Sequence, residues 1–188
     1  PAHLGDHGTY RGTGLCDHPL SWAGVAMSLE LRNVGWNAGF KKIISDVSLR
    51  VTRGEFLGVI GPNGSGKTSM MSVLGGIRAP STGQALLGDQ PMKKIGRRNL
   101  ARHIGFVEQQ ADTIDRITVR DAVALGRTPY LSLLTPWSGH DDAIVCEALA
   151  SVEMGPFADR MWHTLSGGEK QRVHIARALA QQPDFLLL

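Results

Sequence analysis

The apolar residues of the chain occur in short runs separated by turns, starting at residue 28. The first run contains Leu29, Leu31 and Val34, and the second covers residues 43–51. A third run, residues 56–60, is short, apolar and followed by Gly-Pro-Asn-Gly. This pattern predicts a buried strand that enters a loop.

Helical spacing of apolar residues appears further along the chain. Residues 67–74 predict a helix that is closed by a Gly-Gly pair, with Pro80 beyond it. Residues 118–125 and 141–152 predict two more helices, the second with one broad apolar face. That face consists of Ile144, Val145, Ala148, Leu149 and Val152.

Buried strands are also predicted at residues 104–107 and 185–188. The segment 127–139, rich in proline and aromatic residues, separates the two middle helices. The chain contains no internal repeat and no low-complexity linker. We therefore expect one α/β body into which the middle helices are inserted.

Residues 1–26 have scattered glycines and histidines but no hydrophobic period, which predicts a mobile tail. A metal site built from tail residues is conceivable, but their spacing matches none of the usual zinc patterns. The first residue is Pro1, so we expect a fragment or translated upstream sequence, with Met27 as the natural start. The conceivable metal ligands are His3, His7, Cys16 and His18.

Composition narrows the class of protein. Of the 188 residues, 42% are hydrophobic and 20% charged, as in an ordinary globular α/β protein. Lys plus Arg exceed Asp plus Glu by only 20 to 17, without a basic block, which argues against a nucleic-acid partner. Cys16 and Cys146 form no disulfide framework, so a reducing cytosol fits. No apolar run approaches the roughly 20 residues that cross a bilayer, so we expect any membrane role to act through a partner.

The first motif that carries chemistry matches the pattern G-x-x-x-x-G-K-[ST] between a predicted strand and a predicted helix. Its glycines let the backbone turn N–H groups toward phosphates, and the helix adds its positive N-terminal end. Lys67 would reach the β- and γ-phosphates of a nucleotide, and Thr68 would bind Mg²⁺. The motif consists of Gly61, Pro62, Asn63, Gly64, Ser65, Gly66, Lys67 and Thr68.

The second motif is LSGGE, residues 165–169. Ser166 and Glu169 fit a capping box that begins a helix. The cap does not account for Gly167 and Gly168, because paired glycines weaken a helix start unless something approaches the backbone closely. The motif therefore predicts a second anion site as well as a helix start.

Together the two motifs resemble those of ABC ATPases, and the resemblance covers residues 28–188. It implies a P-loop NTPase core, with a mostly parallel sheet flanked by helices and an antiparallel β part. A helical subdomain is inserted at about residues 111–165, and the partial domain covers residues 27–188. In that family LSGGE contacts ATP held by the opposite subunit, so Ser166, Gly167, Gly168 and Glu169 are implied ligands of a partner's ATP.

Other family positions are less well matched. Gln109 corresponds to the Q-loop glutamine, which contacts Mg²⁺ or water, although Glu108 stands where proline is common and Gln110 is a second candidate. Ala38 aligns with the aromatic residue that stacks on adenine. Trp36 or Phe40 are possible substitutes, with Trp36 equally suited to the core.

The family's Mg²⁺-orienting aspartate and catalytic glutamate follow the strand that corresponds to residues 185–188. We therefore expect both carboxylates, and the family's switch histidine, to lie beyond Leu188 and residues 1–188 alone to be inactive. His163 and His174 flank the LSGGE motif, and we expect both to be structural.

Residues 100–102, 117–120 and 125–130 resemble ATPases of importers for ferric siderophores, haem or vitamin B12. Importers of amino acids, sugars or metal ions are the nearest alternatives. Soluble ABC ATPases that act on ribosomes or DNA are another, but only 56 residues separate Gln109 from Ser166, too few for a long coiled-coil insertion. A P-loop kinase or GTPase would have no use for LSGGE.

The resemblance implies ATP and Mg²⁺ as ligands and a second ATPase subunit, in a homodimer, as partner. It also implies a transmembrane permease and, indirectly, a substrate-binding protein, with no nucleic acid. The expected location is the cytoplasmic face of the cell membrane.

Overall fold

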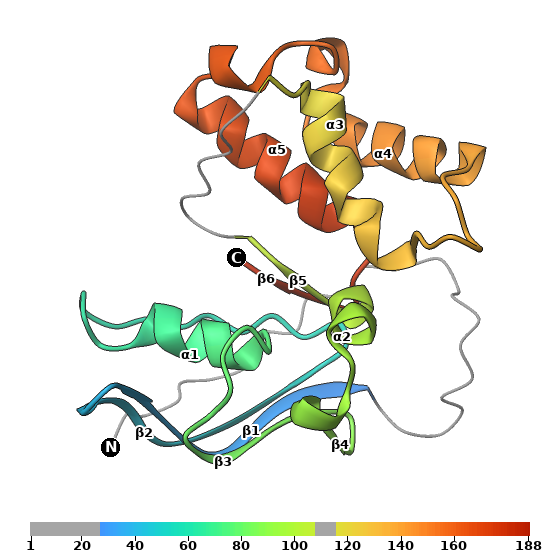
Figure 1. The fold of residues 1–188 in the computed structure, drawn as a ribbon. Coiled ribbons are helices and arrows are strands. Elements are labelled where there is room, and N and C mark those ends of the chain that lie inside the picture. Colours follow the sequence, from blue (N-terminus) through green and yellow to red (C-terminus); the bar gives the residue numbers. More distant parts are fainter. Residues whose placement is uncertain (1–26, 108–115) are drawn as a thin grey trace.

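The structure is a computed structural model that describes residues 27–107 and 116–188. Most strands lie in the first half of the chain, and most helices lie in its second half (Figure 1). The strands are β1 Ser28–Ala38, β2 Lys41–Thr52, β3 Thr82–Leu87, β4 Gln90–Pro91, β5 Ile104–Phe106 and β6 Phe185–Leu187. The α-helices are α1 Lys67–Leu74, α2 Arg97–His103, α3 Val119–Ala124, α4 Gly139–Ser151 and α5 Gly167–Ala180. Short 3-10 helices are η1 Met92–Lys94, η2 Leu125–Tyr130, η3 Gly155–Phe157 and η4 Trp162–Thr164.

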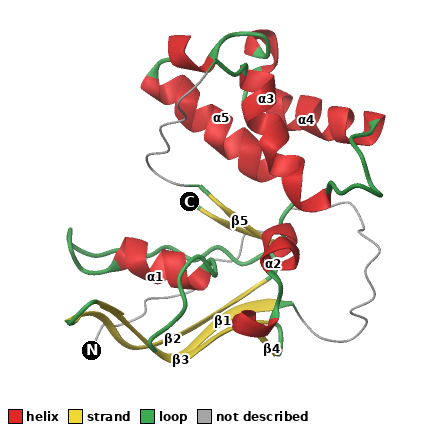
Figure 2. Ribbon diagram, viewed as in Figure 1, coloured by secondary structure: helices red, strands yellow, loops and turns green. Residues whose placement is uncertain are grey.

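The strands form two sheets. The larger is antiparallel, in the order β2-β1-β3-β4, and the smaller is the parallel pair β5-β6, with Ile104 opposite Phe185. Helix α1 lies between them in Figure 2 and packs its buried residues into a core that both sheets share. Residues 27–107 and 185–187 are called the β body below.

The helices of the second half form a separate unit. Helices α3, α4 and α5 pack around a second apolar core that includes Val119, Val145 and Val173, each at most 1% exposed. η2 lies so close to α5 that a Cβ on Gly126 would collide with the carbonyl oxygen of Arg177. Residues 117–180 are called the helical body below, and the chain returns from it to β6 through residues 181–184.

Most expected elements are present. The helix predicted at 67–74 has those bounds, and those predicted at 118–125 and 141–152 correspond to α3 and α4. β5 and β6 confirm two of the predicted buried strands. The middle helices are an insertion between β5 and β6, as expected.

The strand predicted at residues 56–60 is wrong. These residues form no strand, and Phe56 and Ile60 are 94% and 97% exposed. An apolar run becomes a strand only when a neighbouring strand supplies hydrogen bonds. None of the strands in the described part of the chain pairs with this segment.

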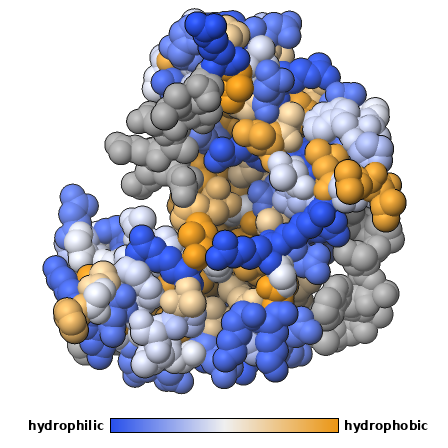
Figure 3. Space-filling view, in the orientation of Figure 1, coloured by the Kyte–Doolittle hydropathy of each residue, from blue (hydrophilic) through white to orange (hydrophobic). Residues whose placement is uncertain are grey.

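The surface carries two apolar features. Leu133 and Leu134, in the turn between η2 and α4, are 101% and 94% exposed. Figure 3 shows apolar surface over this side of the helical body and also in the hollow between the two bodies.

Candidate functional site

The glycine loop before α1 is folded around the ammonium group of Lys67. Its Nζ donates hydrogen bonds to the carbonyl oxygens of Gly61 at 2.6 Å and Pro62 at 2.7 Å. Gly64 and Gly66 have φ values of +81° and +93°, in the left-handed region that glycine adopts without strain. The Lys67 ammonium, at the end of the loop, is therefore hydrogen-bonded to the first two carbonyl groups of the same loop.

The close approach of β2 explains why a glycine, Gly66, stands directly before α1. A Cβ at this position would lie 3.1 Å from the carbonyl oxygen of Ile43 in β2, so the loop and β2 are in close contact. Without a side chain, Gly66 makes no cap to α1. The first N–H groups of α1 are left to an external acceptor, and the helix dipole favours an anion there.

A groove adjoins the loop. It has a volume of about 1020 Å³ and is lined by residues 54–59, by Lys67 and Thr68, and by β6. The Thr68 side chain is exposed in the first turn of α1, and its backbone carbonyl accepts a hydrogen bond from Ser72. A hydroxyl beside a lysine at the mouth of a groove of this size fits a metal-bound polyphosphate.

The LSGGE motif begins α5. The Ser166 hydroxyl accepts a hydrogen bond from the Glu169 backbone at 3.3 Å, and Glu169 Oε2 accepts from the Ser166 N–H at 2.7 Å. The capping box predicted from the sequence is thus confirmed. Ser166 and its two following glycines are exposed.

Glu169 is held in a fixed orientation. Arg160 Nη1 donates to its Oε1 at 2.9 Å, while Nη2 of the same arginine donates to the Thr164 carbonyl. Hydrogen bonds from Ser166 hold the pKa of Glu169 below its ordinary value, and Arg160 lowers it further. Arg160 was not predicted from the sequence, because no local pattern links a single arginine to Glu169, nine residues later in the chain.

Gly167 and Gly168 have no packing reason to be glycine. A Cβ built on either would meet no atom of the residues that the structure describes within 4 Å, and neither has a positive φ. Alanine would fit and would favour the helix. The two glycines therefore leave a bare stretch of backbone that faces open space.

Several other residues singled out in the sequence lie outside the described part of the chain, and others lie within it. Gln109, Glu108 and Gln110 lie outside the described residues, as do the tail residues 1–26 with their conceivable metal ligands. Within residues 27–107 and 116–188, no cluster of three or more potential metal ligands occurs. Buried His174 packs its ring edge against Trp162, 5.0 Å between centroids, which fits the expected structural role, and His163 is exposed.

The two candidate adenine platforms differ in their surroundings. Trp36 is half-buried against the core, and the Arg78 guanidinium lies 4.5 Å from its ring centroid. Phe40, in the turn between β1 and β2, is 110% exposed. Ala38 ends β1 and offers no aromatic face.

The helices described in the structure are all too short or too polar to span a bilayer.

In Figure 1, the loop before α1 and the start of α5 lie in different parts of the molecule, the first in the β body and the second in the helical body. The two motifs thus face separate regions of space within one chain.

Several known proteins are similar to this chain in sequence or in fold. The petrobactin import ATP-binding protein FpuD of Bacillus anthracis is 36% identical over 161 residues, which are 86% of this chain and 59% of the relative. The sulfate/thiosulfate import ATP-binding protein CysA of Photorhabdus laumondii is 36% identical over 162 residues, 86% of this chain and 44% of the relative. The chain thus spans less than two thirds of the length of these relatives.

A solved dimeric structure of an ATP-binding cassette in a post-hydrolysis state, bound to ADP and Pi, superposes with a TM-score of 0.72 at 31% identity. The match covers 84% of this chain and 72% of that one. Residues 44–188 match the family model described as ABC transporter. This match covers most of the chain, which therefore belongs to the ABC transporter family, as the two motifs predicted.

Proposed function

We propose that the chain is the ATP-binding subunit of an ABC importer and that it hydrolyses ATP together with a second copy of itself. The observation that carries the proposal is the loop of residues 61–68, which closes around the Lys67 ammonium. The ADP- and Pi-bound dimeric relative supports both the nucleotide and the pairing of subunits.

The residues of the loop have separate roles in binding ATP. The N–H groups after Gly61 and at the start of α1 donate to phosphate oxygens. Lys67 exchanges its two carbonyl partners for oxygens of the β- and γ-phosphates. Thr68 supplies a hydroxyl for Mg²⁺, with Gln109 as a further ligand. Bound Mg²⁺ neutralises charge that develops on the phosphates.

The bare backbone of the LSGGE motif supports a sandwich of two subunits. Ser166, Gly167, Gly168 and Glu169 belong to the surface that meets ATP on the opposite subunit. Since no atom of residues 27–107 or 116–188 lies within 4 Å of a Cβ built on either glycine, a large polyanion can approach the first N–H groups of α5. The Arg160 contact keeps Glu169 turned toward its cap rather than toward that anion.

Phe40 is the aromatic residue that we propose for stacking on adenine. Its ring is exposed, whereas Trp36 is already in contact with the core and with Arg78. The Phe40 turn lies close in sequence to Ile43, which touches the phosphate loop at Gly66. An aromatic ring at that position adds contact with any base whose phosphates lie in the loop.

The carboxylates that position Mg²⁺ and activate water are proposed to follow the strand that ends with Leu187. Residues 1–188 alone should then bind nucleotide but release no phosphate above background, because phosphoryl transfer depends on those groups. A phosphate-release assay that compares residues 1–188 with the full-length protein checks this expectation.

The transported molecule is proposed to be an iron chelate, haem or a cobalamin. The loop and helix sequences at 100–102, 117–120 and 125–130 support this class, and one relative is a petrobactin import protein. A sulfate import protein of equal identity shows that overall similarity does not separate the classes.

The exposed Leu133 and Leu134 support a protein partner at the helical body, since exposed apolar groups favour burial in an interface. We propose a transmembrane permease as that partner, fed by a substrate-binding protein, with the subunit on the cytoplasmic face of the membrane. A soluble ABC ATPase that acts on ribosomes or DNA is the competing function.

Replacement of Lys67 tests the nucleotide site. In the full-length protein, Lys67→Ala should weaken binding of a fluorescent ATP analogue by about 100-fold or more, since charged hydrogen bonds contribute roughly 1.5–3 kcal/mol each. Lys93→Ala, at an exposed lysine of η1, is the matched control and should leave the affinity within about twofold. Equal affinities for Lys67→Ala and the unsubstituted protein would contradict the proposal.

A further inference from the structure

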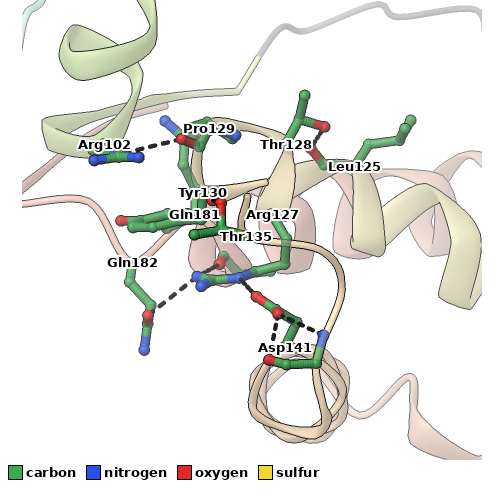
Figure 4. A network of polar contacts seen from close by, with 12 residues as sticks. Arg102, Leu125, Arg127, Thr128, Pro129, Tyr130, Thr135, Asp141, Gln181 and Gln182 are labelled. Carbon is green, nitrogen blue, oxygen red and sulfur yellow. Dashed lines mark hydrogen bonds and ion pairs between the residues drawn. The ribbon is translucent and has the colours of Figure 1, made fainter. Parts of the chain in front are cut away.

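A network of polar contacts joins the β body to the helical body. Their apolar cores are two separate clusters with no residue in common. Hydrogen bonds from arginine, tyrosine and glutamine side chains to backbone carbonyls join the bodies instead, and Figure 4 shows the central part of this network. These residues, called the junction below, are Arg98, Arg102, Arg127, Pro129, Tyr130, Asp141, Gln181 and Gln182.

Arg127 lies at the centre of the junction. Its Nε donates to Asp141 Oδ1 at 2.9 Å, and its Nη1 donates to the Ala180 carbonyl at 3.0 Å and to Gln182 Oε1 at 3.2 Å. The side chains of Arg127 and Asp141 are only 4% and 8% exposed. One guanidinium thus ties η2 to the first turn of α4, to the last residue of α5 and to the chain that returns to β6.

The neighbouring contacts carry this connection into the β body. The Arg127 guanidinium carbon lies 4.0 Å from the centroid of the Tyr130 ring, so the two groups stack. The Tyr130 hydroxyl donates a hydrogen bond to the Gln181 carbonyl at 3.0 Å. The Gln181 amide donates to the carbonyls of Ala101 and Ile104, at the end of α2 and the start of β5. From α2, Arg98 and Arg102 both donate to the Pro129 carbonyl, at 2.9 and 3.0 Å.

The polar chemistry of the junction suits a contact that fixes the angle between the β body and the helical body. Burying a guanidinium and a carboxylate costs desolvation, which the ion pair and its extra hydrogen bonds must offset. Apolar side chains would hold the bodies together at a lower cost, but they would not fix a direction. A planar guanidinium with several partners does fix one.

The arrangement of α5 makes that angle important for the LSGGE motif. The junction holds the C-terminal end of α5, and Ser166 lies at the other end of its 14 residues, about 21 Å away at 1.5 Å per residue. A rotation of about 5° at the junction would therefore move Ser166 by about 2 Å. Phosphoryl transfer does not tolerate a displacement of that size.

We propose that Arg127 is a positioning residue. It sets the angle between the two bodies and thereby places Ser166 and the glycines of LSGGE against the nucleotide of the opposite subunit. The effect on turnover rests on the proposed function, whereas the effect on the angle does not.

The angle can be measured directly with two spin labels in the full-length protein. Cys146 is a free, exposed thiol on α4 and labels the helical body, and Asp89→Cys in the turn after β3 labels the β body. Cys16→Ser removes the thiol of the tail. Double electron–electron resonance then gives the distribution of label distances with no need for nucleotide or activity.

Arg127→Met keeps the aliphatic bulk and removes every polar contact of the guanidinium. It should broaden or shift the distance distribution, whereas Arg127→Lys, which keeps the charge beside Asp141, should broaden it less. Arg172→Met is the matched control, because the Arg172–Glu153 ion pair of 3.3 Å also joins two elements of the helical body, α5 and the turn after α4, but is exposed and includes no junction residue. If Arg127→Met fails to fold, Arg127→Met with Asp141→Asn avoids an unpaired buried charge.

The same variants are then assayed for ATP turnover. Arg127→Met should lower kcat by about tenfold or more while KM and the affinity of a single subunit for the ATP analogue stay within about twofold. An unchanged distance distribution overturns the proposal. A changed distance distribution with unchanged kcat overturns the positioning role. If the unsubstituted protein fails to bind ATP, the proposed function is overturned, but the distance distributions still test whether Arg127 sets the angle between the two bodies.

Discussion

The helices of the two bodies begin in different ways. In the β body, α1 and α2 start after Gly66 and Gly96, and neither has a side-chain cap. In the helical body, α3, α4 and α5 each start at a serine or threonine whose backbone N–H donates to an acid three residues later. The pairs are Thr118 with Asp121, Ser138 with Asp141, and Ser166 with Glu169.

This difference separates two uses of a helix start. A capped start is satisfied by its own residues and helps a short helix to form by itself, which suits an insertion with its own small core. An open start leaves N–H groups for water or a ligand. Openness alone identifies no site, because α2 is also open but lacks the lysine and the left-handed glycines of the loop before α1.

The largest expected effect comes from closing the space in front of the capped LSGGE motif. Ser166→Arg places a long cation where the opposite subunit's nucleotide should lie. ATP-dependent dimerisation and turnover of the full-length protein should fall by about 100-fold or more, because the reacting groups are displaced.

The affinity of a single subunit for ATP should remain within about twofold in Ser166→Arg, because the phosphate loop lies in the other body. Size-exclusion chromatography with and without ATP measures the dimer, and His163→Arg, at an exposed position of η4, is the control. A normal ATP-dependent dimer of Ser166→Arg would rule out the sandwich.

Local patterns in the sequence predicted the parts of the molecule that depend on local physics. The phosphate loop and the Ser166 cap each lie within eight consecutive residues, so spacing alone indicates them. A strand at 56–60 would need a neighbouring strand to pair with, and apolar character alone does not reveal whether one is present.

The junction could not be predicted for a similar reason. The partners of Arg127 are 14, 53 and 55 residues away in sequence, and a lone arginine after a glycine gives no signal of them. Sequence spacing reveals a turn or a cap, but a buried polar network between two bodies becomes visible only once the chain is folded.

A fall in pH is expected to have an effect of intermediate size on the stability of the helical body. The pKa values of Asp121 and Glu169 are lowered by hydrogen bonds from Thr118 and Ser166. Burial raises the pKa of Asp141, but hydrogen bonds from Ser138 and Arg127 outweigh it, so the net pKa is also lowered. All three acids cap helices of the helical body.

A carboxyl group with a lowered pKa in the folded state stabilises the fold above its unfolded pKa and ceases to do so as pH falls through the folded pKa. The ordinary values are 3.8 for Asp and 4.5 for Glu, so the stability of the helical body should decline below pH 4.5. Circular dichroism at fixed urea concentrations measures it. In Asp121→Asn the loss below that pH should be smaller, and an unchanged pH profile would contradict the role of its cap.

The smallest expected effect is that of adding one methyl group at Gly168, which should change stability and dimerisation in opposite directions. Gly168 lies in the first turn of α5 with a helical backbone and open space around its Cβ position. Gly168→Ala should therefore stabilise the subunit by about 0.5 kcal/mol, because alanine loses less backbone entropy in a helix. The same methyl group stands where the opposite subunit's phosphates should approach, so ATP-dependent dimerisation should weaken. Gly139→Ala, in the first turn of α4 with equally open space, is the matched control and should alter stability alone. Urea unfolding and size-exclusion chromatography measure the two quantities. If dimerisation of Gly168→Ala stays as strong as that of Gly139→Ala, the bare backbone at the start of α5 does not face a nucleotide.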